Sequence, residues 1–416
     1  MSKSRGREVE PRDRAFGKRV ADLRRARGLT QQQLAALLSN RTSGWMSQVE
    51  RGIQPVRRMD VLQEIAAALG VSAQTLNPDA PLPAPAAEPV PVLSNDLDAA
   101  REVIAGHPAL NALLGTEPAA PVDLEALTAQ VDEMWEQTHQ AAHPVVSDMV
   151  TELIPKLEQA VRTVAEQDRP QAYGLLSNAY QALAAAFARQ GDARAAWVAA
   201  DRAITTAELA GDALLVCAGV FRMVHAFVRL GDKQEAERAA RTAIQALEQR
   251  GSLPPEGLSV LGSLHLAKAL VHARQSQRAE AREEIGKARR VAEQLGEDRN
   301  DYHLEFGPTN VAIQAVSTAV ELGDAGEAID VAQTIDAEDL SPERQGRLLM
   351  DLGRAYAQRR QTSDAVDCLL RAERLSPDLV QNHAAVRAAV KEMVLVSGPN
   401  VPTDLMDLAD RTNAME

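Results

Sequence analysis

Apolar residues near the N-terminus recur every three or four positions, which is the spacing of one face of an α-helix. A glycine or a polar break follows each run, so the pattern divides residues 12–77 into short helices. Gly28 and Gly70 are predicted helix ends, and Thr30 with Gln33 fits a capping box. The positions predicted to face the core are Phe16, Val20, Leu23, Leu34, Leu37, Leu38, Met46, Val49, Val61, Leu62, Ile65 and Leu69.

A short polar turn separates the second and third of these helices, which is typical of a helix-turn-helix. The third helix is predicted to start near Ser43 and to end at Gly52. Its open side would carry groups that bond base edges and phosphates. These are Ser43, Gly44, Ser47, Gln48 and Arg51. The pattern alone also allows a plain helical bundle with a polar face.

A proline-rich stretch follows this region. Residues 77–92, NPDAPLPAPAAEPVPV, hold six prolines and predict an extended, semi-rigid spacer. We therefore expect a linker at 78–95, a helical connecting region at 96–169 and a repeat domain at 170–416.

The last of these regions repeats a short alanine pattern. The pieces GDARAA, GDKQEA, SQRAEA, GDAGEA and RQTSDA end at Ala196, Ala236, Ala281, Ala328 and Ala365, and an aromatic residue precedes three of them by nine positions. Small residues let paired helices approach closely, as in tetratricopeptide repeats, which stack into a superhelix with a concave face. A helical array without repeats is the alternative.

Composition supports a helical protein that has two different surfaces. Aromatic residues make up only 3% of the 416 residues, while alanine and leucine carry most of the apolar content. Residues 1–78 hold 14 basic and 7 acidic residues, whereas the remainder holds 31 basic and 51 acidic residues. This asymmetry indicates a basic module for a polyanion joined to an acidic body, although a solvated basic arm would also produce it.

Nothing in the sequence indicates catalysis, and we predict neither an enzyme nor a cofactor. His139 and His143 have a spacing that can bind zinc, but Gln140 stands where a metalloprotease needs glutamate, so no metal site is predicted. Cys217 and Cys368 lack a paired framework, and the start of the chain lacks an apolar signal region. No apolar run approaches membrane-spanning length, so we expect a cytoplasmic, nucleoid-associated protein.

Several motif pieces of the N-terminal region occur in the order of a known family. The pieces LRRARGLTQQQLA, SQVERG and PVRRMDVLQEIAAALGVS, within residues 14–76, resemble the xenobiotic-response-element (Cro/C1-type) helix-turn-helix family. The resemblance implies a five-helix repressor-type domain and a buried ion pair between Arg24 and Glu50. It also implies phosphate contacts by Gln31 and Arg51, and base contacts by Ser43, Gly44 and Gln48.

The turn LSNRTSG is one residue longer than the common pattern of that family. We therefore add Thr42, Trp45 and Ser47 to the candidate DNA contacts, with packing as the alternative for Trp45. The form SGWMSQVERG resembles a branch common among actinomycete regulators.

The complete layout resembles the peptide-pheromone receptors of Gram-positive bacteria, which join the same two modules. It implies a sequence-specific transcriptional regulator that binds an inverted-repeat operator in double-stranded DNA. Its tetratricopeptide-like domain would dimerise and sense a peptide, small-molecule or protein effector. A DNA-anchored docking scaffold without a small ligand is the alternative. The predicted effector groove is near Asn178, Arg222, His265 and Asn310.

Overall fold

The computed structural model describes residues 11–38, 41–56, 59–77, 97–107, 122–336, 342–381, 383–398 and 400–415. Within these residues the regular elements are helices, and a single antiparallel bridge joins Arg299 to Phe306. The predicted all-α fold is therefore confirmed. The predicted linker at 78–95 lies outside the described residues.

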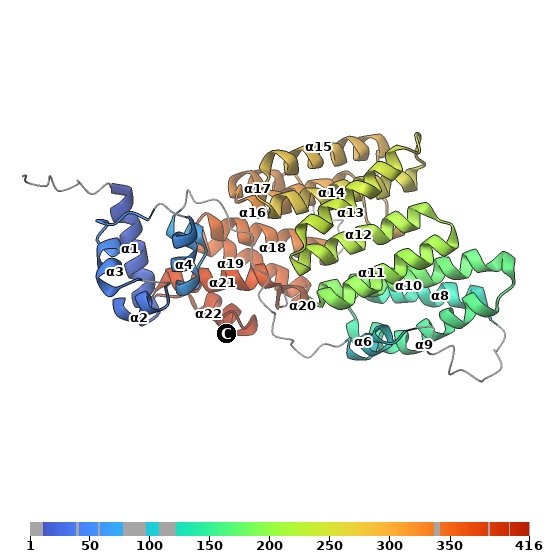
Figure 1. Ribbon diagram of the computed structural model, residues 1–416, viewed down its shortest axis with the longest axis horizontal. Helices are drawn as coiled ribbons and strands as arrows, with labels where there is room; N and C mark the ends of the chain where they lie inside the picture. Colours follow the sequence, from blue (N-terminus) through green and yellow to red (C-terminus); the bar gives the residue numbers. More distant parts are fainter. Residues whose placement is uncertain are drawn as a thin grey trace, which may run out of the picture.

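Five short helices form the N-terminal domain, which occupies one end of the molecule (Figure 1). They are α1 (Pro11–Ala26), α2 (Gln31–Ala36), α3 (Ser43–Glu50), α4 (Met59–Leu69) and α5 (Ala73–Leu76). Their apolar faces enclose one core, in which every predicted core residue except Leu37 is buried. Leu37 was predicted to face inward, but at the C-cap of α2 its side chain is 61% exposed, while Leu38 next to it is buried.

The predicted connecting region packs directly against the start of the array. It contains α6 (Asp98–Ala105), α8 (Leu124–His139), α9 (His143–Thr163) and the short 3₁₀ helix η1 (Glu166–Asp168). Its residues Trp135 and Leu153 share one core with Leu183 and Phe187 of the next helix. The first turns of the helical body therefore include this region.

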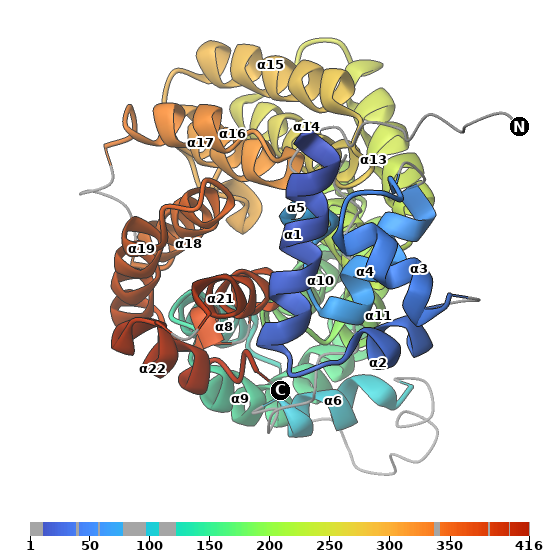
Figure 2. The ribbon, with the colours of Figure 1, turned by 90° about the vertical axis from the view of Figure 1, so that its left-hand side faces the viewer.

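Five helix pairs follow, and their helices are antiparallel neighbours in sequence. The pairs are α10 (Arg169–Arg189) with α11 (Ala193–Ala210), α12 (Ala213–Leu230) with α13 (Lys233–Glu248), α14 (Pro255–Arg274) with α15 (Arg278–Leu295), α16 (Pro308–Leu322) with α17 (Ala325–Ala332), and α18 (Pro342–Gln358) with α19 (Thr362–Leu375). The 3₁₀ helix η2 (Asp301–His303) lies between α15 and α16, and α20 (Pro377–Gln381), α21 (Ala384–Ser397) and α22 (Thr403–Arg411) end the chain. Figure 2 shows the pairs curling into a superhelix around a common axis.

The repeated alanines lie where paired helices touch. Ala196, Ala236, Ala281, Ala328 and Ala365 are each no more than 1% exposed and lie near the start of the second helix of a pair. A methyl side chain allows the helices to approach closely at these points. The pattern predicted from sequence therefore marks the helix pairs of the array.

We expected no apolar segment of membrane-spanning length, but helix α12 is one. Its 18 residues have a mean hydropathy of 1.7, so by length and composition this helix could cross a membrane. In the structure it packs against α10, α11, α13 and α14, and residues such as Leu215 and Val224 are buried in these contacts. Packing against these neighbours accounts for the buried part of α12, which is 39% of its residues.

Candidate nucleic-acid interface

Capping residues fix the ends of the two central helices of the N-terminal domain. The Oγ1 atom of Thr30 accepts a hydrogen bond from the backbone N–H of Gln33, whose side chain in turn accepts one from the backbone N–H of Thr30. Thr42 caps α3 by accepting a hydrogen bond from the N–H of Trp45. These caps satisfy backbone donors that a helix start leaves unpaired, so they determine where α2 and α3 begin.

Helix α3 lies unusually close to α1. A Cβ atom built on Gly17 of α1 would be 2.4 Å from the carbonyl oxygen of Val49 and 2.5 Å from that of Glu50. No larger residue fits there without moving the backbone. Met46 and Val49 on the inner side of α3 are fully buried, so the orientation of α3 is set by packing.

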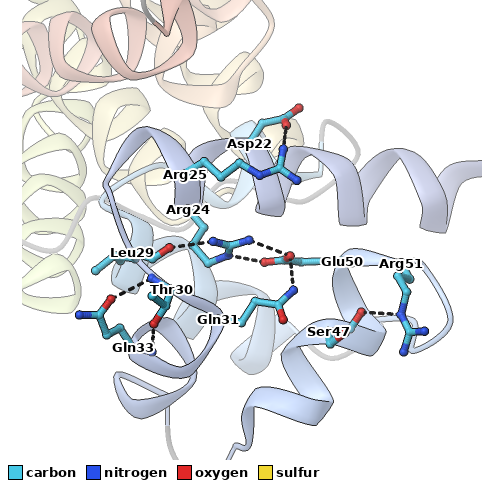
Figure 3. A network of polar contacts seen from close by, with 10 residues as sticks. All are labelled: Asp22, Arg24, Arg25, Leu29, Thr30, Gln31, Gln33, Ser47, Glu50 and Arg51. Atoms are coloured by element: carbon cyan, nitrogen blue, oxygen red, sulfur yellow. Dashed lines mark hydrogen bonds and ion pairs between the residues drawn. The ribbon is translucent and has the colours of Figure 1, made fainter.

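Arg24 and Glu50 form the predicted ion pair between α1 and α3 (Figure 3). The Nε atom of Arg24 donates to Oε1 of Glu50 at 2.6 Å, and Nη2 donates to Oε2 at 3.0 Å. Gln31 donates from Nε2 to Oε2 of Glu50 at 2.7 Å, and Nη1 of Arg24 donates to the carbonyl of Leu29 at 2.7 Å. The network therefore ties α1, the start of α2 and the end of α3 together.

The charges of this network stabilise each other. The side chains of Arg24 and Glu50 are only 11% and 7% exposed. Burial would raise the pKa of Glu50, but the hydrogen bonds from Arg24 and Gln31 outweigh it and hold the pKa below its ordinary value. The hydrogen bond to Glu50 raises the pKa of Arg24. Both groups are consequently charged at neutral pH.

The opposite side of α3 presents polar groups to solvent. Ser43, Gly44 and Gln48 are exposed, as is Thr42 at the cap. Figure 1 shows α3 at the outer edge of the molecule, away from the array. An α-helix with an open polar face of this kind fits the major groove of DNA, where amide and hydroxyl groups reach base edges.

The remaining candidate contacts differ in how available they are. Arg51 is exposed, although its Nε atom donates to the carbonyl of Ser47, which is itself half-buried. Trp45 is half-buried against the domain core, and the guanidinium of Arg41 lies 4.5 Å from its ring centroid. The amide nitrogen of Gln31 donates to Glu50. The same side chain would therefore have to bond Glu50 and make the predicted phosphate contact.

The four predicted groove residues are spread over four helices. Asn178, Arg222 and Asn310 are partly buried on α10, α12 and α16. His265 is 4% exposed, and its Nδ1 atom lies 2.6 Å from Oε2 of Glu284 on α15. The placement of His265 in a groove is therefore wrong, because this side chain fills the contact between α14 and α15.

A contact between the N-terminal domain and the end of the array had no signal in the sequence. Leu395 of α21 packs against the core of the N-terminal domain, and Nη2 of Arg360 donates to the carbonyl of Thr75 at 3.4 Å. Leu395 and Thr75 belong to helices whose periodicity shows only that one face is apolar, and Arg360 lies in the turn between α18 and α19. Which helix packs against the apolar face of α21 is determined by the tertiary fold, so the sequence pattern does not reveal it.

The fold and this geometry can be set beside known proteins. Residues 15–78 match the family described as "Helix-turn-helix domain", and no curated protein sequence matches the chain. Among solved structures, the chain is similar to BtubC (BKLC) from P. vanneervenii, with 16% identity and a TM-score of 0.36 over 61% of this chain and 91% of that one. It is also similar to Bacillus thuringiensis PlcR in complex with the peptide PapR7 and DNA, with 15% identity and a TM-score of 0.28 over 68% of this chain and 96% of that one. The N-terminal part of this chain is a helix-turn-helix domain, the kind of module through which proteins bind DNA.

Proposed function

We propose that this protein is a sequence-specific transcriptional regulator of the Cro/C1 type that reads DNA with the exposed face of α3. The observation that carries the proposal is the pairing of this open polar face with a buried Arg24–Glu50 network that holds it in place. The basic N-terminal segment would attract phosphates, while the acidic remainder of the chain would not. The protein would act with the chromosome in the cytoplasm.

A single helix-turn-helix contacts too few base pairs to select one site in a genome, so the proposed regulator acts as a homodimer on inverted half-sites. The test is to select bound duplexes from a random pool with the full chain and to measure its mass in solution by light scattering. Enrichment of two inverted half-sites by a dimer supports the proposal. A protein that stays monomeric with and without DNA, or a selection that enriches no sequence, overturns it.

The helical array is proposed to sense an effector and to change the affinity for DNA. An effector can do so only through different affinities for two arrangements of the protein, and couplings of about 1–3 kcal/mol are typical. The test compares operator affinity of the full chain with that of residues 1–78 fused to an unrelated dimeriser, in buffer and in fractions of cell extract. If extract changes neither affinity or both equally, the docking scaffold replaces the sensor.

A further inference from the structure

A cleft lies where the N-terminal domain meets the helical array. It has a volume of about 580 Å³ and is lined by α5 with its N-cap Ser72, by α21, and by parts of α15, α17 and the turn after α18. Figure 1 shows the N-terminal domain beside α21. A small molecule in this cleft would therefore touch the DNA-binding domain and the array at once.

The charges that α15 and the start of α17 bring to the cleft are already paired. Arg282 lies 3.3 Å from a carboxylate oxygen of Asp324 and also forms an ion pair with Glu327. Arg278 lies 2.8 Å from the other carboxylate oxygen of Asp324. These ion pairs join two neighbouring helix pairs, so this part of the cleft has a structural role and little charge left for a ligand.

The turn after α18 carries an arginine where the repeat pattern favours glycine. Three other helix pairs have Gly191, Gly231 and Gly323 at this place, five residues before the repeated alanine, and all three have positive φ. Arg360 occupies the corresponding place with φ of 65°, in the left-handed region that a side chain disfavours. Residues held in such conformations are concentrated at ligand-binding and switch sites. The side chain of Arg360 is therefore a candidate for a binding role.

The two arginines of this turn have donors available. Arg360 is exposed, and of its five N–H groups only one on Nη2 is bonded, to the carbonyl of Thr75 at 3.4 Å. Arg359 is also exposed, and among the described residues its side chain has neither a hydrogen bond nor an ion pair. Guanidinium groups bind carboxylates with paired N–H donors. This side of the cleft can therefore hold a carboxylate.

Glu392 of α21 contributes the opposite charge. Its Oε1 atom accepts a hydrogen bond from the hydroxyl of Thr75, which is only 2% exposed. The carboxylate is half-buried, and within the described part of the chain it forms no ion pair, either with Arg359 or with Arg360. A carboxylate that has lost part of its water is stabilised by a cation. The cleft thus contains positive and negative groups that do not neutralise each other directly.

We propose that the cleft binds a small zwitterion, whose carboxylate is held by Arg359 and Arg360 and whose ammonium group is held by Glu392. An ion of one sign would be attracted by one of these sites and repelled by the other, whereas a zwitterion matches both. A free amino acid and the two ends of a short peptide share this chemistry.

A zwitterion bound in this way would favour the arrangement in which the N-terminal domain is docked on the array, because it contacts both. The consequence for DNA affinity rests on the proposed function, whereas the binding itself does not.

The test is isothermal titration of the full chain, without DNA, with each standard amino acid in turn and with trialanine. We expect at least one of these probes to bind. Its N-acetylated form should bind about 10- to 100-fold more weakly, because it lacks the ammonium group and the charge-assisted hydrogen bond to Glu392. Tighter binding of trialanine than of any amino acid identifies a peptide as the source, and the reverse order identifies a free amino acid.

Variants of the two charged sides locate the binding. Arg359→Gln should weaken it about 10- to 100-fold. Arg241→Gln is the matched control, since it removes the same charge from α13, outside the cleft, where Arg241 is 52% exposed. Glu392→Gln keeps an oxygen that can accept the hydrogen bond from Thr75 but removes the charge. It should weaken binding of the parent zwitterion more than binding of the N-acetylated form.

Arg360→Gly separates binding from folding. Glycine fits the left-handed backbone, so the melting temperature should not fall, while the loss of the guanidinium should weaken binding. The proposal is overturned if no probe binds at millimolar concentration, if N-acetylation leaves binding unchanged, or if Arg359→Gln and Arg241→Gln weaken binding equally. Operator affinity without any zwitterion, measured in parallel, reports on the proposed function independently.

Discussion

The hydroxyl of Thr75, at the end of the helix-turn-helix domain, donates a hydrogen bond to Oε1 of Glu392 on α21. The two residues are 317 positions apart, and this bond accompanies the packing of Leu395 against the domain core. The DNA-binding domain is therefore in direct contact with the end of the array. Helix α21 also contacts α1. A displacement of α21 can therefore be transmitted to α1 by direct contact as well as through the covalent chain.

Leu395→Asp should release the N-terminal domain from the array. A carboxylate at this position cannot remain against the apolar core without a large desolvation cost. We expect faster hydrogen exchange of the amides of α21 and α1 and a larger radius of gyration in solution scattering. Val396→Asp is the matched control, because Val396 is the next residue on α21 and is 41% exposed. Equal effects of both variants would show that the packing of Leu395 does not hold the domain.

Arg24→Met should destabilise the N-terminal domain by about 3–5 kcal/mol, because it leaves the buried carboxylate of Glu50 without its main partner. Hydrogen exchange of the α1 and α3 amides in the full chain measures this loss locally. Arg25→Met removes the same charge one residue away, where the side chain is 68% exposed, and should change stability by less than about 1 kcal/mol. A loss for Arg24→Met no larger than for Arg25→Met would contradict the buried network.

Lowering the pH should reduce the stability of the N-terminal domain, because Glu50 becomes protonated. Its pKa is lower in the folded than in the unfolded protein, so the ion pair contributes stability above the unfolded pKa, about 4.3, and loses it as the pH falls through the folded pKa. Glu50→Gln should therefore be less stable than the wild type at pH 7, and the difference should shrink below about pH 4. Hydrogen exchange from pH 7 to pH 3 measures it, and a constant difference would exclude this carboxylate as the source.

The sequence predicted the helices of the N-terminal domain because each has an apolar stripe and an end signal. Leu37 was misplaced because it caps the end of α2 with its side chain exposed, while the next residue, Leu38, is the one that is buried. His265 was misplaced because α14 is buried on most sides, so its pattern does not distinguish a groove from a helix contact. Polar composition also does not reveal that Tyr302 and His303 adopt positive φ, at 51° and 56°, or that the ring of His303 stacks on that of Trp135.

The arrangement of charges inside the array was also beyond sequence reasoning. Arg229 and Arg347 are more than one hundred positions apart, and nothing local indicates that their charges lie close enough to repel each other. Their proximity follows from the curvature of the stacked helix pairs. Curvature depends on many small packing differences between pairs, each of which is too weak to read from a single sequence.

The last prediction separates base reading from phosphate binding on α3. Gln48→Ala should remove a base contact and cost about 1–3 kcal/mol of discrimination at one base pair, because an amide side chain can bond an adenine edge with two hydrogen bonds. Arg51→Ala should instead weaken binding to all duplexes similarly and reduce the salt slope by about one. Duplex selection and affinity at several salt concentrations measure both, with Gln249→Ala at the exposed end of α13 as the control. If Gln48→Ala selects the same sequences as the wild type, another residue of the exposed face reads that base pair and the orientation assigned to α3 in the groove is wrong.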